Sequence, residues 1–120
     1  MAEIGDRAVS EPIPESDLYE RVNLAPAETG LPMTIFASPR GHARHDVRIK
    51  VNGVHGPRMT LEQVAEVAVR PAPRVISGHL SAADRQAVFA WIALNAAALA
   101  DYWEFHIYTS EFLRRLRRLP

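Results

Sequence analysis

The clearest pattern of apolar and polar positions lies between residues 81 and 103, where apolar side chains recur at spacings of three and four among many alanines. That spacing places the apolar side chains on one face of a helix. Ser81 and Asp84 stand where the two partners of a capping box belong. We predict a helix over 81–104, whose buried face carries Val88, Ile92, Asn95, Leu99, Tyr102 and Trp103. We expect the buried Asn95 amide to satisfy loop backbone near Gly78 or Tyr108.

A second pattern is the strict alternation over residues 43–51, which predicts a strand with one buried and one solvated face. The Asn52-Gly53 dipeptide that follows is typical of a turn. The predicted core face holds His45, Val47, Ile49 and Val51, and the opposite face holds Arg44, Asp46, Arg48 and Lys50.

Weaker patterns complete the expected fold. Residues 31–37 predict a strand with Met33, Ile35 and Ala37 on one face, and residues 64–70 predict another after a turn over 59–63. Thr109 is expected to cap a last helix over 110–119. The expected fold class is α+β, with a three-stranded, largely antiparallel sheet packed against one long helix plus a short C-terminal helix.

Length and composition indicate a single domain over residues 31–120, preceded by an acidic, proline-containing arm over 1–30. The arm has seven acids, two arginines and few large apolar side chains, so it cannot bury enough surface to order alone. A short helical turn over 16–22 would dock it on the domain. The alternative is a tether that orders on a partner, with Asp17 and Tyr19 as contacts.

Several classes of function are disfavoured by composition. The chain has no cysteine, which excludes disulfides and thiolate chemistry, and its first residues lack the apolar region of a secretory signal. We therefore expect a cytoplasmic protein without a membrane partner. No nucleotide-binding glycine loop, nucleophile elbow or metal-ligand spacing is present, so we expect no cofactor and no metal, and an enzyme is the less favoured class.

The net charge of zero hides a segregation, because residues 31–80 hold seven bases and three acids. On the predicted strand face, Arg44, Arg48 and Lys50 form a basic stripe that Arg58, and also Arg40, Arg70 and Arg74, would extend. Such a stripe fits nucleic acid, although the aromatic side chains that bind single strands are missing from it. A solvated face paired with the acidic arm is the favoured alternative.

Two histidines, His42 and His45, are the candidates for acid–base chemistry. Residues three apart on a strand point to opposite faces, so the two imidazoles converge only if residues 41–44 form a loop.

Five short blocks of this sequence, in this order, resemble a family of small bacterial proteins. They are RIKV at 48–51, the Pro-x-Val-x-x-Gly of 73–78 with LSAAD at 80–84, WIALN at 91–95, Tyr-Trp at 102–103 and YTSEFLRRL at 108–116. A more distant similarity is to small domains encoded beside toxin–antitoxin genes. The resemblance covers about residues 31–119 and implies a fold, but no activity or catalytic residue.

Together these features favour a non-catalytic, protein-binding regulator or inhibitor that acts through the basic strand face or the acidic arm. A role in bacterial defence, mobile elements or toxin–antitoxin systems follows from the resemblance alone. The alternative is a small RNA-binding ribonuclease-type toxin that uses His42 or His45 with the basic strand. An exposed sheet edge also offers a route to a homodimer.

Overall fold

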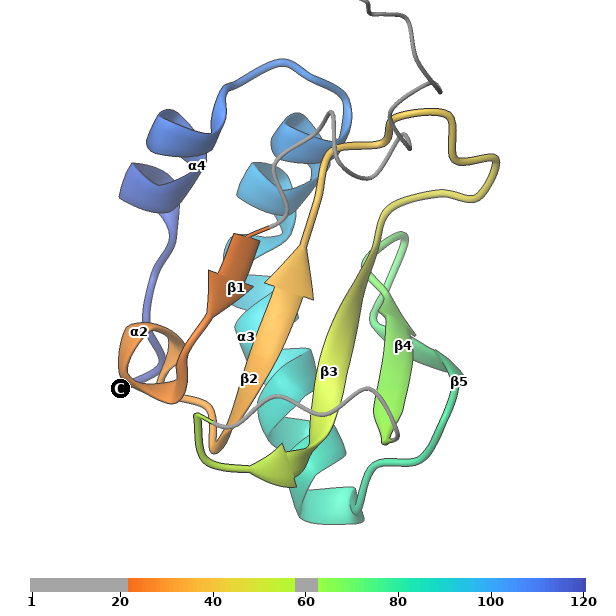
Figure 1. Ribbon diagram of the computed structural model, residues 1–120, viewed down its shortest axis with the longest axis vertical. Coiled ribbons are helices and arrows are strands. Elements are labelled where there is room, and N and C mark those ends of the chain that lie inside the picture. Colours follow the sequence, from red (N-terminus) through yellow and green to blue (C-terminus); the bar gives the residue numbers. More distant parts are fainter. Residues whose placement is uncertain (1–21, 58–62) are drawn as a thin grey trace, which may run out of the picture.

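The computed structural model describes residues 22–57 and 63–120, which form an antiparallel sheet with helices on one face (Figure 1). The strands lie in the order β1-β2-β3-β4-β5, and each pairs antiparallel with its neighbours in sequence. The elements are β1 (Val22–Leu24), α2 (Pro26–Thr29), β2 (Met33–Ala37), β3 (Arg48–His55), β4 (Val64–Ala68), β5 (Arg74–Ser77), α3 (Ala82–Trp103) and α4 (Thr109–Arg115).

The α+β class and the antiparallel pairing are confirmed, but the expected three strands are five. The two additional strands, β1 and β5, are the outer strands of the sheet, where Leu24 pairs with Ile35 and Val75 with Val67. Each is three or four residues long. A segment that short carries too few positions to display alternation, which is why the sequence pattern does not reveal it.

The last residues of the expected arm belong to the sheet. Residues 22–30 form β1 and α2, in which Leu24 and Thr29 are buried. The described part of the chain begins at Val22, so the predicted helical turn over 16–22, with Asp17 and Tyr19, falls almost entirely outside it.

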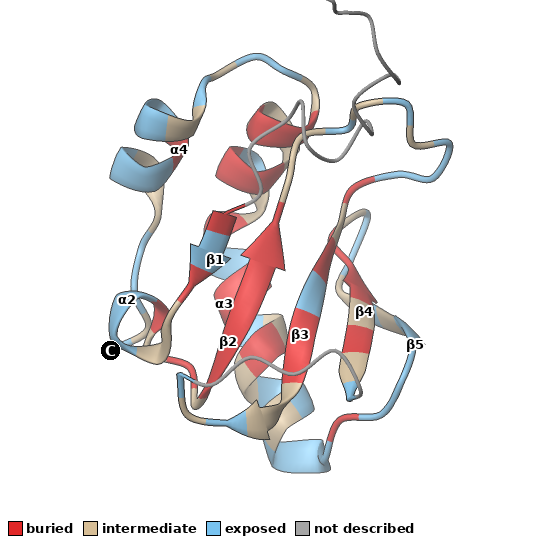
Figure 2. Cartoon of the chain, viewed as in Figure 1, coloured by how far each residue is buried: buried red, intermediate tan, exposed pale blue. Residues whose placement is uncertain are grey.

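The core lies between α3 and one face of the sheet (Figures 1 and 2). Met33, Ile35 and Ala37 face it from β2, which confirms the alternation expected there. From the helix, the buried side chains are Val88, Trp91, Ile92, Asn95, Ala98, Leu99, Tyr102 and Trp103. We call the face of the sheet that points away from α3 the outer face.

The strand expected over 43–51 is displaced along the chain. Val47, Ile49 and Val51 are buried as predicted, but β3 begins only at Arg48 and runs through Asn52-Gly53 to His55. The turn predicted at Asn52-Gly53 is therefore wrong. A Cβ atom at Gly53 would lie 2.6 Å from the carbonyl oxygen of Gln63, so glycine serves here for close approach of the backbone. The turn predicted over 59–63 lies outside the described residues except for Gln63.

The central helix α3 confirms the prediction for 81–104 and its N-cap. The Ser81 hydroxyl accepts a hydrogen bond from the backbone N–H of Asp84 at 3.1 Å. The carboxylate of Asp84 contacts Nε2 of His55 at 2.9 Å, which joins the end of β3 to the start of the helix. None of the helices in the described part of the chain is both long and apolar enough to cross a membrane.

The last helix, α4, is shorter than predicted. It ends at Arg115 with Tyr108 at the N-cap position, and the residues from Leu116 onward are not helical. Phe112 is buried and stacks on Tyr102 with ring centroids 4.2 Å apart, whereas Leu113 is exposed. The backbone N–H of Leu119 donates to the carbonyl of Thr29 at 2.8 Å, a contact that competes with helix continuation.

Candidate functional site

A pocket of about 610 Å³ opens beside the outer face of the sheet, where the β2–β3 loop over residues 38–47 meets the end of α3. Three of its residues form one row across neighbouring strands, because Phe36 of β2 pairs with Lys50 of β3, which pairs with Glu66 of β4. The loop contributes a second side, and Trp103 adds the end of the central helix. The lining side chains that bear on function are Phe36, Arg40, His42, His45, Arg48, Lys50, Glu66 and Trp103.

The charged side chains in the pocket differ in whether an opposite charge pairs with them. Nη1 of Arg48 donates to Oε1 of Glu66 at 2.7 Å, and this hydrogen bond lowers the pKa of the Glu66 carboxyl. That pair is neutral as a unit. The Lys50 side chain is exposed and forms no hydrogen bond or ion pair with another described residue, although its charge also lowers the pKa of the Glu66 carboxyl. The pocket therefore has an excess of positive charge, supplied by Lys50 and Arg40.

Two weak contacts hold Arg40 at the rim of the pocket and leave its guanidinium group exposed. Its Nε donates to the carbonyl of Ala43 at 3.3 Å, and its Nη1 lies 3.9 Å from Oε1 of Glu104. The side chain remains 53% exposed. Its remaining N–H groups are thus available to an anion in the pocket.

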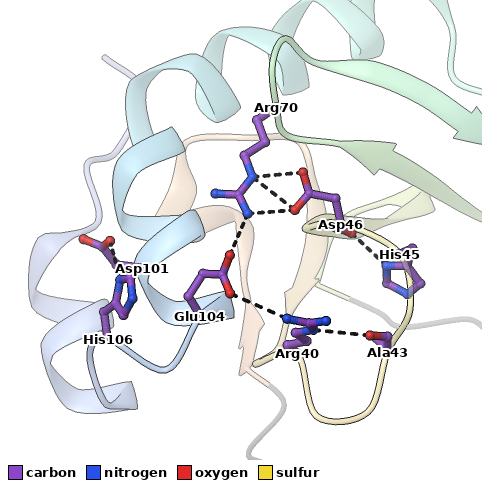
Figure 3. A network of polar contacts seen from close by, with 8 residues as sticks. All are labelled: Arg40, Ala43, His45, Asp46, Arg70, Asp101, Glu104 and His106. Atoms are coloured by element: carbon purple, nitrogen blue, oxygen red, sulfur yellow. Dashed lines mark hydrogen bonds and ion pairs between the residues drawn. The ribbon is translucent and has the colours of Figure 1, made fainter.

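An ion-pair network fixes the loop against the rest of the molecule (Figure 3). Arg70 donates to both carboxylate oxygens of Asp46 and, at 2.9 Å, to Glu104 at the end of α3. The hydrogen bond from Arg70 lowers the pKa of the Asp46 carboxyl. The backbone N–H of Arg40 donates to the carbonyl of Trp103 at 3.0 Å. Three segments that are distant in sequence are joined at this point.

The two candidate histidines both line the pocket, which meets the condition that residues 41–44 form a loop. The prediction that His45 lies on the core face is wrong. Its ring stacks on Trp103, with centroids 5.3 Å apart, and its Nδ1 lies 2.8 Å from the carbonyl oxygen of Asp46. The alternation fails here because β3 begins only at Arg48, so His45 lies on the loop and not on a strand.

The remaining predicted residues are divided between the pocket and other places. Arg48 and Lys50 line the pocket, whereas Arg44 is exposed on the loop outside it. Arg70 belongs to the network, and Arg74 is exposed on β5. Three predicted binding residues, Asp17, Tyr19 and Arg58, lie outside the described residues.

Sequence reasoning missed the aromatic part of the site. Phe36 and Trp103 line the pocket, so aromatic side chains do accompany the basic stripe. For Phe36 a signal existed, since it alternates with Ile35 and Ala37 and must therefore point to the outer face. For Trp103 there was none, because its contact with the loop depends on tertiary structure.

The pocket combines excess positive charge, aromatic rings and two imidazoles, a set suited to binding an anion that carries an apolar or aromatic part. Within residues 22–57 and 63–120, no three histidine, aspartate or glutamate side chains gather in a way that could hold a metal ion. Comparison with protein-family models, with curated proteins and with solved structures found no match.

Proposed function

We propose that this protein is a non-catalytic binding protein that recognises an anionic macromolecule through the pocket on the outer face. The observation that carries the proposal is the pair of cations, Arg40 and Lys50, placed on two sides of one pocket. Among the described residues that line this pocket, the one carboxylate is that of Glu66, and it is paired with Arg48. A cationic concavity concentrates anionic partners and speeds their association. The regulator or inhibitor expected from the sequence would use this surface.

Affinity capture tests this function. Tagged wild-type protein, Lys50→Glu and Arg114→Glu are incubated with lysate of the source organism, and bound material is quantified. Arg114 is a matched control, because it is exposed on α4, away from the pocket, and the charge change is identical. We expect a macromolecule that wild type and Arg114→Glu retain and Lys50→Glu loses. Equal retention by all three would show that the pocket is not the binding surface.

A second function, ribonuclease activity, is favoured by one observation: His42 and His45 line the same pocket as the cations. Two imidazoles near a bound phosphate could act as general base and general acid. The double variant His42→Ala/His45→Ala separates the two functions when incubated with a labelled RNA. Cleavage by the wild type that this variant abolishes would establish the enzyme, and intact RNA after incubation with both proteins would leave the non-catalytic function.

A further inference from the structure

We propose that the anion recognised by the pocket is single-stranded nucleic acid, with one unstacked nucleotide seated in the pocket and its flanking phosphates on Arg40 and Lys50. This inference rests on the proposed function and deepens it by naming the class of partner.

The two cations lie on different elements that line the same pocket. Lys50 projects from the middle of β3, and Arg40 stands on the loop at another side of the same pocket. Both are exposed, and neither is held by a short ion pair within the described residues, since the nearest carboxylate to Arg40 is 3.9 Å away. Glu104 instead makes its close contact with Arg70, at 2.9 Å. Cations on different sides of one pocket can contact the phosphates that flank a nucleotide bound in it.

Among the described lining residues, the exposed aromatic ring that a base would contact is that of His45, whereas Phe36 and Trp103 are buried. The exposed His45 ring lies on Trp103 with an interplanar angle of 29°, and this buried indole supports it from below. Phe36 lines the same pocket from β2, next to Lys50 in the strand register. Nucleic-acid bases stack on such side chains without regard to sequence, because every base has a π-face.

The same features disfavour the other polyanions. An acidic peptide would use the cations, but its carboxylates would not stack on the exposed His45 ring. A duplex keeps its bases stacked and presents only phosphates, so it would engage Lys50 and Arg40 but leave the pocket empty. A pocket of about 610 Å³ lies within the range that encloses small ligands, which suits one unstacked nucleotide.

Fluorescence anisotropy with the full-length protein tests the proposal. The probes are a labelled ten-nucleotide single-stranded RNA, its DNA counterpart, a duplex of the same length and labelled poly-L-glutamate. The variants are Lys50→Gln, His45→Ala and the control Arg114→Gln, each checked for folding by circular dichroism. All three residues are exposed, so the fold should tolerate the changes.

We expect the single strands to bind more tightly than the duplex or poly-L-glutamate. His45→Ala should weaken single-strand binding by roughly tenfold without changing its salt dependence, because it removes stacking. Lys50→Gln should weaken binding and lower the slope of log affinity against log salt by about 0.7, because it removes one phosphate contact. Arg114→Gln should behave as wild type.

Three results would overturn the proposal: no binding of single strands, equal affinity for the duplex or poly-L-glutamate, or unchanged affinity of His45→Ala. If poly-L-glutamate binds and Lys50→Gln releases it while single strands do not bind, the partner is an acidic protein and the proposed function stands. If Lys50→Gln alters the binding of no probe and the capture experiment also shows no dependence on Lys50, the proposed function fails as well.

Discussion

At the scale of the residue, Asn95 shows how one buried amide organises the C-terminal segment. Its Nδ2 donates to the carbonyls of Trp91 and Arg117, both at 3.0 Å, and its Oδ1 accepts from the backbone N–H of Arg117 at 2.7 Å. The prediction that this amide satisfies loop backbone is confirmed, but the partner is the chain after α4 and not the region of Gly78 or Tyr108.

Asn95→Ala leaves both backbone groups of Arg117 without these partners, so we expect a loss of about 1–3 kcal/mol in the free energy of unfolding. Urea denaturation measures it, and Gln86→Ala, on an exposed position of the same helix, is the control. Equal midpoints for the two variants would contradict this account.

At the scale of the element, the β2–β3 loop owes its position to Arg70. The Arg70, Asp46 and Glu104 side chains are all at least one-third exposed, and exposed ion pairs contribute little to global stability. For Arg70→Ala we therefore expect less than about 1 kcal/mol of destabilisation. The loss of local stability in the β2–β3 loop should be larger, since the loop loses its link to α3 and to the end of β4. The backbone amide of Arg40 donates to the carbonyl of Trp103, and that of Ala43 donates to the carbonyl of Arg40. Hydrogen exchange should become faster at both amides in Arg70→Ala. The control is Arg85→Ala, on the exposed surface of α3, which should leave both exchange rates unchanged. Unaltered exchange in Arg70→Ala would mean that the loop holds its shape without the network.

At the scale of the whole molecule, the extended C-terminal segment links α3 to α2. Besides the Asn95 contacts, Leu119 N–H donates to the Thr29 carbonyl, and Nε of Arg118 donates to the Ala27 carbonyl at 2.9 Å.

Deleting residues 117–120 should lower Tm by several degrees, because a loss of 1 kcal/mol corresponds to about 4–8 °C in a domain of 60–100 residues. Deleting Pro120 alone is the control. Combining the deletion with Asn95→Ala should cost less than the sum of the two, since they remove a shared contact. Additive losses of Tm would show that the segment and Asn95 act independently.

Acid stability is also a property of the whole molecule. The pKa values of Asp46, Glu66 and Asp101 are lowered by hydrogen bonds from Arg70, Arg48 and Arg115, respectively. A carboxyl whose pKa is lower when folded contributes stability above its unfolded pKa, and that contribution is lost as pH falls through the folded value. Unfolded aspartate and glutamate titrate near pH 4. Urea denaturation should therefore give a free energy of unfolding that declines as the pH falls below about 4.5. Asp101→Asn should make the decline shallower, and a steeper decline would contradict the assignment.

The sequence alone determined the elements whose signals are local. The central helix and its Ser81 cap follow from apolar spacing and N-cap chemistry, and the buried faces of β2 and β3 follow from alternation. Alternation also placed Arg48 and Lys50 on the outer face. Each of these depends on residues within a few positions of one another, and backbone geometry fixes their directions.

Tertiary structure alone decided the rest, because the deciding contacts join residues distant in the chain. β1 and β5 exist through pairing with β2 and β4, and β3 passes through Asn52-Gly53 because it pairs with β4, where Asn52 lies opposite Val64. The last residues leave the helix because Thr29 and Asn95 bind their backbone. One side of the pocket formed in the same way: the loop, which is linked to Arg70, brings His45 onto Trp103 beside the basic strand. Phe36 joins that strand through the sheet register alone.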